Sequence, residues 1–397
     1  MPSPDSNRPG LLIRDPFRYT DAVLLVPPTW AVALSYLDGE HTALDVQEIL
    51  TRSLGTLVFS DEVQEFVGIL RRQGFLETEE FEQRRERRHQ EFREGQERLA
   101  AHAGTAYPET PEEIHRTFAG YFGGIEAAGD PDPPDDLLGV AAPHVSPEGG
   151  RGCYAATYQR LAGRPALAQR TFMVLGTSHW GAPDKYGLTR KSFVTPLGTL
   201  RVDTELVGWL EARGGPAVSR EDYCHTIEHS IEFQGVFLQY VLQPDLKIVP
   251  ILCGPLVESG PRGEAAENAG AREHFLQALG ELAEEHGERL FWVLGIDLAH
   301  RGRRYGEAVS ALANRGQMVE VAEQDRRRLE LVCTGDSQGI LEIVKAQRDE
   351  LNWCGHSALY TFLRAVGKVR GRLLRYEQWN IDPQSVVSFA SLEFRPA

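Results

Sequence analysis

The sequence predicts an α/β protein in which a mostly parallel sheet, flanked by helices, follows a small winged-helix-like α+β domain. From residue 137 onward, short apolar runs alternate with amphipathic helical segments. The runs are LLGVAAP (137–143), TFMVLGTS (171–178), KIVPILCG (247–254) and FWVLGID (291–297). Apolar strands that alternate with helices are typical of a parallel sheet buried on both faces. The first 78 residues have a pattern of their own, so we expect domains at 1–78 and 103–397, joined by a charged helical linker at 79–102.

The first domain is predicted to contain two short strands followed by short helices. LLIRD (11–15) and AVLLV (22–26) are typical of strands. Thr42 then occupies a helix N-cap position with Asp45 three residues later, a variant of the capping box. We expect Ser60 to cap the next helix and Gly74 to end it.

The linker and the ends of the second domain have equally clear patterns. Residues 79–101 interleave Glu and Arg three or four positions apart, which is typical of a solvated helix and unlike a basic nucleic-acid arm. The second domain is expected to open with a helix capped by Thr110. RLLRYEQWN (372–380) and SVVSFASLEF (385–394) are predicted to form a closing pair of strands.

Charge and composition exclude several classes of partner. The 397 residues carry a formal net charge of -15, with a pI near 5.3, which argues against binding to nucleic acid or anionic membranes. No apolar segment approaches the roughly 20 residues of a membrane-spanning helix, and the N-terminus has no secretory signal. Five cysteines without a CxxC pair fit a reducing compartment. The sequence therefore predicts a cytoplasmic protein.

Polar residues follow the apolar runs at the points where the predicted strands end. His144 follows the first run, His179 the second, and Asp297 and His300 the last, while NWCG (352–355) places Cys354 beside a glycine. Ligands of such sheets bind outside the carboxyl ends of the strands, so we expect these side chains to converge there. Each residue alone would suit a structural role, but repeated imidazoles at strand ends favour a shared site.

The chemistry of these side chains favours a metal. Neutral imidazole and thiolate are ligands that suit iron, zinc or copper. Three protein ligands with open coordination positions are typical of a catalytic or exchangeable metal centre rather than a closed structural one.

Eight ordered motifs then carry a family resemblance. They are GTAYPETPEEI, APHVSPEGG, LGTSHWG, TPLGTL, EHSIEFQGVFLQY, VPILCG, GIDLAH and NWCG. With these motifs the region from about 103 to 394 resembles the Memo family, in its bacterial form as protein B of the AmmeMemoRadiSam system. That family resembles class III extradiol dioxygenases, which hold a non-haem Fe(II) in a doubly wound α/β fold. One departure is the loop VSPEGGRG after His144, which is longer than the AGY-type turn of many members.

The resemblance implies roles for individual residues. It implies metal ligation by His144, His179 and Cys354, where Cys354 replaces the carboxylate of the dioxygenases and favours softer metals. His300 corresponds to the acid/base histidine, and Asp297 is placed to orient its imidazole. His229, at an expected helix start, is a further candidate for the catalytic site or an anchor for the helix.

Two functions of different classes are compatible with these patterns. One is a metal-dependent oxidoreductase, with Fe(II) as the expected metal and copper or zinc as alternatives. The other is a non-catalytic metal-binding partner in a multiprotein system with other AmmeMemoRadiSam proteins.

Residues 1–78 resemble PqqD-like peptide-recognition domains through LDGEHTALDVQEIL and VQEFVGILRRQGFLE, which implies a peptide or protein partner that adds a strand to a sheet edge. Packing or dimerisation is the alternative role of this first domain. For the second domain, a zinc hydrolase is a third function beside the oxidoreductase and the non-catalytic partner.

Overall fold

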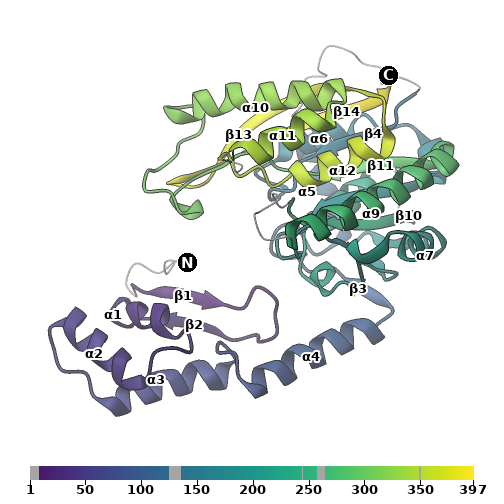
Figure 1. Ribbon diagram of the computed structural model, residues 1–397. Helices are drawn as coiled ribbons and strands as arrows, with labels where there is room; N and C mark the ends of the chain where they lie inside the picture. The colour runs from purple at the N-terminus through teal and green to yellow at the C-terminus, as the bar shows by residue number, and fades with distance from the viewer. Residues whose placement is uncertain (1–8, 125–135, 244, 257–263, 348–349) are drawn as a thin grey trace. The chain divides into compact units, whose positions relative to one another are not determined.

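The computed structural model describes residues 9–124, 136–243, 245–256, 264–347 and 350–397. The chain divides into two compact units, Met1–Glu94 and Gly95–Ala397. The boundary differs from the expected linker at 79–102, because helix α4 (Glu79–Glu94) belongs to the first unit (Figure 1). Tyr19 explains this, since its hydroxyl lies 2.8 Å from His89 Nε2 and its ring contacts Phe81 edge-on. One face of this highly charged helix therefore packs against its own unit.

The first unit is a small α+β domain with a two-stranded antiparallel sheet. Besides α4, its elements are β1 (Leu11–Arg14), β2 (Val23–Val26), α1 (Pro28–Ala31), η1 (Val32–Tyr36), α2 (Ala43–Leu54) and α3 (Ser60–Gln73). The strands β1 and β2 form the sheet. The predicted capping box of Thr42 and Asp45 is confirmed, and Gly74 ends α3 in the left-handed conformation. The expected cap at Ser60 is wrong by one residue. Phe59 is the N-cap, and its backbone N–H donates to the Glu62 side chain at 2.8 Å.

The second unit contains the predicted mostly parallel sheet. Along its main path the strands follow the order β12-β14-β4-β11-β5-β10-β8-β7-β3, with β6, β9 and β13 paired beside it. The strands are β3 (Glu97–Leu99), β4 (Gly139–Ala142), β5 (Thr171–Thr177), β6 (Tyr186–Leu188), β7 (Ser192–Thr195), β8 (Gly198–Val202), β9 (Val218–Arg220), β10 (Leu246–Cys253), β11 (Leu290–Gly295), β12 (His300–Gly302), β13 (Val369–Asp382) and β14 (Ser385–Pro396).

The four apolar runs singled out in the sequence form four adjacent strands, β4, β11, β5 and β10. Each pairs in parallel with its neighbour, and Gly295 of β11 lies in register with Gly176 of β5. These strands are buried along almost their whole length, which is why their sequences are continuously apolar rather than alternating. The predicted closing pair of strands is confirmed as β13 and β14, which pair antiparallel.

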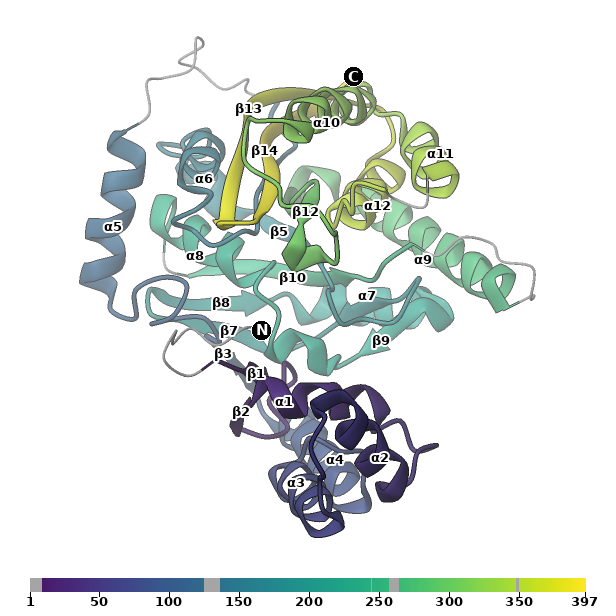
Figure 2. The same ribbon diagram turned by 90° about the vertical axis from the view of Figure 1, so that its left-hand side faces the viewer.

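Helices cover both faces of this sheet. The α-helices are α5 (Pro111–Gly123), α6 (Arg151–Tyr158), α7 (Thr204–Arg213), α8 (Glu232–Val241), α9 (Glu264–His286), α10 (Gln317–Thr334), α11 (Ser337–Gln347) and α12 (His356–Val366). The short 3-10 helices are η2 (Pro165–Gln169), η3 (Gly215–Ala217), η4 (Tyr223–Thr226), η5 (Gly287–Arg289) and η6 (Arg303–Tyr305). In Figure 2, α5, α6 and α8 lie on one side of the central strands, whereas α9 and α12 lie on the other. Thr110 is confirmed as the N-cap of α5.

Across the described ranges, no helix has the length and apolar character needed to cross a membrane.

Candidate metal centre

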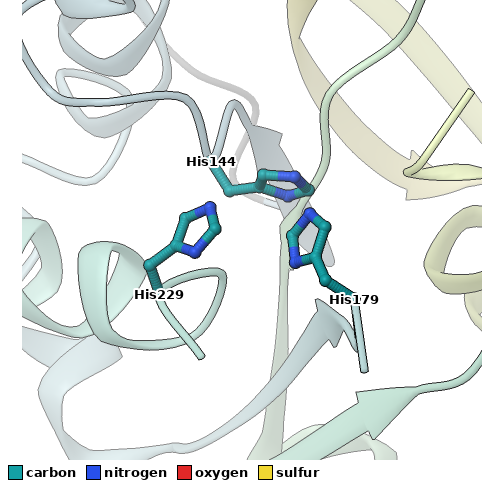
Figure 3. A group of neighbouring side chains, drawn as sticks. All are labelled: His144, His179 and His229. Atoms are coloured by element: carbon teal, nitrogen blue, oxygen red, sulfur yellow. The ribbon is translucent and has the colours of Figure 1, made fainter. Parts of the chain in front are cut away.

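Three histidines converge beyond the carboxyl ends of the central strands. His144 follows β4, His179 follows β5, and His229 precedes α8. Figure 3 shows their imidazole rings turned toward one another around a common space. One ring nitrogen from each lies within 4.8 Å of one from each of the other two. Because β4 and β5 both pair in parallel with β11, the sheet brings the residues after them to the same edge, as predicted.

Hydrogen bonds orient two of the three rings toward this space. Nδ1 of His144 lies 3.0 Å from the carbonyl oxygen of Gly295, so it donates its proton there. Nδ1 of His179 lies 2.9 Å from Oε2 of Glu228. In both rings the lone pair therefore resides on Nε2, the atom left to bind a ligand. A metal-binding histidine usually has such a partner on its other nitrogen.

Glu228 is a site residue that was not predicted from the sequence. Its Oε1 also accepts a hydrogen bond from the His179 backbone N–H at 2.6 Å, and its Oε2 lies 3.9 Å from Nδ1 of His229. The carboxylate is buried, with 2% of its side chain exposed. The adjacent Glu-His pair of the EHSIEFQ motif was the available signal, since a carboxylate next to a candidate ligand often supports a neighbouring ligand.

A second group of donors shares His144. The Sγ of Cys354 lies 3.2 Å from His144 Nε2, and Oδ2 of Asp297 lies 3.6 Å from the same atom. Ligand atoms of His144, Asp297 and Cys354 all lie within 4.8 Å of one another. The three ligands that the resemblance implies are thus divided between two groups, with His144 in both. His229, expected to belong to the catalytic site or to anchor the helix, has a ring nitrogen within 4.8 Å of ring nitrogens of His144 and His179.

Asp297 and His300 have separate partners. Oδ1 of Asp297 accepts hydrogen bonds from the backbone N–H groups of His144 at 3.0 Å and Val145 at 3.2 Å. The expected orienting contact between Asp297 and the His300 ring is replaced by two carbonyls. Nδ1 of His300 lies 2.9 Å from Leu298 O and 3.0 Å from Asn352 O, which leaves Nε2 to exchange a proton.

Two glycines allow the loops around the site to approach closely. A Cβ on Gly295 would lie 2.2 Å from the carbonyl oxygen of Ser230, next to His229. A Cβ on Gly355, next to Cys354, would lie 2.6 Å from Cβ of Ile296 and 2.7 Å from the carbonyl oxygen of Asp297. Real Cβ atoms do not come so close to other heavy atoms, so only glycine permits these two approaches.

Burial sets the protonation of the site. It lowers the pKa of His144 to about 3, with the neighbouring His179 adding to the effect. Burial also lowers the pKa of His229 and His300 below the ordinary value. For His179 burial acts in the same direction, but the Glu228 carboxylate outweighs it and raises the pKa. Burial raises the pKa of Asp297 to about 6.

The donor set fits a transition metal ion. Imidazole nitrogens and a neighbouring thiol are ligands for iron, copper or zinc. The side chains of His179 and His229 are 30% and 31% exposed, so solvent or a small ligand can reach the same space. Closed structural sites lack such access.

Known proteins of one family match this chain over most of its length. The family model for Memo-like proteins matches residues 98–393. A MEMO1 family protein of Aquifex aeolicus (strain VF5) is 24% identical over 388 residues, 96% of this chain and 95% of the relative. A MEMO1 family protein of Methanopyrus kandleri is 29% identical over 313 residues, 75% of this chain and 99% of the relative. Among solved structures, an uncharacterized protein from Escherichia coli K12 has a TM-score of 0.40 at 14% identity, with 65% of this chain and 99% of that chain covered.

The family match includes every residue of the site, from His144 to Cys354, and extends over well more than half of the chain. The chain therefore belongs to the family of Memo-like proteins.

Proposed function

We propose that the second unit binds a transition metal ion through His144, with His179, His229 and Cys354 as the further donors, and acts as an oxidoreductase of extradiol dioxygenase-like architecture. The observation that carries the proposal is the convergence of three imidazoles, two of them oriented by partners on Nδ1, beside a thiol. Fe(II) is the metal we favour, and copper or zinc are the alternatives. A redox-active ion bound there would bind substrate and O₂ in its open positions and allow electrons to pass from the substrate to O₂.

The protein's own residues would then hold the ligands and move a proton. Asp297 fixes the loop of His144 through two backbone N–H groups, and Glu228 fixes His179. His300 keeps its proton on Nδ1 through two carbonyls, so its Nε2 is the atom that would take a proton from a substrate or return it. The edge of the Tyr305 ring, with centroids 4.9 Å apart, limits the movement of this imidazole.

Metal analysis of the full chain purified without oxygen tests the proposal. We expect close to one equivalent of iron, lost when His144 is replaced by alanine. Zinc in place of iron would favour hydrolysis, and copper would favour a chelating role. A parent protein that retains no transition metal after reconstitution with Fe(II), Cu(I) and Zn(II) in turn would refute the proposal.

The first unit supports a second candidate, a non-catalytic metal-binding partner that recognises a peptide. Among the described residues, β1 and β2 pair only with each other, and Val23 and Leu25 of β2 are 57% and 38% exposed. A short sheet with an apolar edge strand suits a peptide or protein that adds a strand, as in PqqD-like domains. Other proteins of the AmmeMemoRadiSam system are the partners that this reading implies.

Peptide binding is tested by titrating the full chain with peptides encoded near it while following backbone amide shifts. We expect shifts confined to residues 11–14 and 23–26. Shifts elsewhere, or none with every neighbouring peptide, would leave packing or dimerisation as the role of the first unit.

A further inference from the structure

Asp325 is a buried carboxylate that belongs to neither group of donors in the candidate metal centre. It lies on α10, is fully buried, and accepts three side-chain hydrogen bonds. Its Oδ1 accepts from Trp353 Nε1 at 2.6 Å, and its Oδ2 accepts from Tyr376 Oη at 2.7 Å and Ser388 Oγ at 2.6 Å. Burying a carboxylate is costly, and three donors offset that cost.

The bond from Trp353 leads to the thiol of the candidate metal centre. Trp353 immediately precedes Cys354 and is itself almost fully buried. Arg328, on the same side of α10 as Asp325, lies over the indole ring at 5.3 Å from its centroid. The residue before Trp353 is Asn352, whose carbonyl oxygen accepts from His300. The indole of Trp353 is held at its N–H by Asp325 and on its face by Arg328. Asp325 therefore restricts the segment that carries the Asn352 carbonyl and the Cys354 thiol.

The bond from Ser388 leads to the loop between Asp297 and His300. The Ser388 hydroxyl accepts a hydrogen bond from the backbone N–H of Ala299 at 2.9 Å. The two backbones are also paired, with Leu298 N–H donating to Ser388 O at 2.8 Å and Ser388 N–H donating to Ala299 O at 2.9 Å. Asp325 is therefore linked to two loops. Trp353 connects it to the segment that carries Cys354, and Ser388 connects it to the loop between Asp297 and His300.

All three of these bonds are donated to Asp325, so both of its carboxyl oxygens act as acceptors. Since Ser388 Oγ already accepts from Ala299, its own proton points to Asp325. The Tyr376 hydroxyl likewise accepts from Gln378 Nε2 at 3.0 Å and donates to Asp325. An asparagine at position 325 would have one acceptor oxygen and one NH₂ group. Its NH₂ group would face at least one of the three groups that donate to Asp325, and that hydrogen bond would be lost.

We propose that Asp325 is a positioning residue that fixes Cys354 in place relative to Asp297 and His300, a role that rests on the proposed metal site. The Tyr376 bond provides an internal contrast, because Tyr376 lies on β13 and carries neither loop. A carboxylate that merely satisfies buried donors would respond equally to the loss of any of the three. A positioning carboxylate responds at the metal centre only to the loss of Trp353 or Ser388.

The test compares Asp325→Asn, Trp353→Phe, Ser388→Ala and Tyr376→Phe in the full chain, with circular dichroism to confirm folding. Co(II) is the probe for the metal site, because a thiolate ligand gives it a charge-transfer absorption band. We expect Asp325→Asn, Trp353→Phe and Ser388→Ala to weaken Co(II) binding by about 10–100-fold, the usual effect of losing support for a metal ligand. Tyr376→Phe should bind Co(II) as the parent does.

A second readout needs no metal. In the apoprotein, the rate at which iodoacetamide alkylates Cys354 should rise severalfold in Asp325→Asn and Trp353→Phe, while that of Cys333, on the same helix as Asp325, should stay constant. Unchanged Cys354 alkylation and Co(II) affinity in Asp325→Asn would overturn the inference, as would an equal effect of Tyr376→Phe. If Asp325→Asn does not fold, the same comparison of Trp353→Phe and Ser388→Ala against Tyr376→Phe decides. A parent protein that binds no Co(II) would refute the metal site, whereas the alkylation rates would still test the positioning of Cys354.

Discussion

Glu228 holds His179 at two points, accepting from its backbone N–H at 2.6 Å and lying 2.9 Å from its ring Nδ1. One carboxylate thus fixes both the position and the orientation of a candidate ligand. Glu228→Gln keeps one acceptor oxygen but loses the charge, so we expect the affinity for Co(II) to fall by about 10–100-fold without vanishing. Calorimetry with Co(II) measures this. Glu112→Gln, on the exposed surface of α5, is the matched control and should be silent.

His144 belongs to both groups of donors, so its loss should be the most damaging. We expect His144→Ala to weaken Co(II) binding by more than the roughly 100-fold seen when only a supporting residue is lost. His229→Ala removes a donor from the group of three histidines, and Cys354→Ser removes the thiol from the group of His144, Asp297 and Cys354. The variant that loses more affinity for Co(II) identifies the group that holds the ion. Equal affinity in His144→Ala and the parent would exclude both groups.

Glu232 should make the stability of the second unit depend on pH. Burial acts to raise the pKa of this carboxyl, but the buried Arg98 guanidinium outweighs it and holds the pKa below the ordinary 4.5. The stabilisation is therefore complete above the unfolded pKa and is lost as pH falls through the lower folded pKa. Glu232→Gln leaves Arg98 buried without its charge partner, so we expect a loss of about 3–5 kcal/mol in the free energy of unfolding at pH 7.

Urea unfolding of the second unit between pH 3 and pH 7 checks both parts of this prediction. Below pH 4.5 the parent should lose stability more steeply than Glu232→Gln. Glu285→Gln, whose side chain is 64% exposed beside His286, should change stability by less than about 1 kcal/mol. Parallel curves for the parent and Glu232→Gln would contradict the prediction.

The start of the second unit can be tested with two fragments. Residues 95–397 should fold alone and bind metal, since Gly95–Ala397 is a compact unit by itself and the family match at 98–393 lies within it. Residues 103–397 lack Arg98 and the backbone N–H groups of Ala101 and His102, which donate to Glu232 at 2.9 Å and 3.0 Å. We expect the shorter fragment to unfold at a markedly lower temperature by circular dichroism. Equal melting temperatures would place the boundary at 103 after all.

The central sheet could be predicted from sequence because strand burial leaves a local signature. Continuous apolar runs marked β4, β5, β10 and β11, and the residues directly after them placed His144 and His179 at one edge. The boundary between the two units was harder to predict from the sequence, because it depends on the packing of single residues. The charged pattern of 79–94 hides that Tyr19 contacts Phe81 and His89, so this helix was expected to be a solvated linker.

The relation of His229 to the other histidines could not be read from sequence. His229 follows no strand, and its position depends on how closely the turn before α8 approaches β5 and β11. That approach involves backbone atoms such as Ser230 O, which have no pattern in the sequence. The role of Glu228 in orienting His179 has the same origin, because the two residues are 49 positions apart.

Gly295 and Gly355 contribute no donor atom, yet they should be among the positions least tolerant of random substitution. Even alanine at Gly295 would force the Ser230 backbone away, and with it the neighbouring His229. Alanine at Gly355 would separate Cys354 from the Asp297 segment in the same way. Variants selected for loss of metal would therefore be expected to include these two residues alongside the histidines, although the protein would keep every ligand.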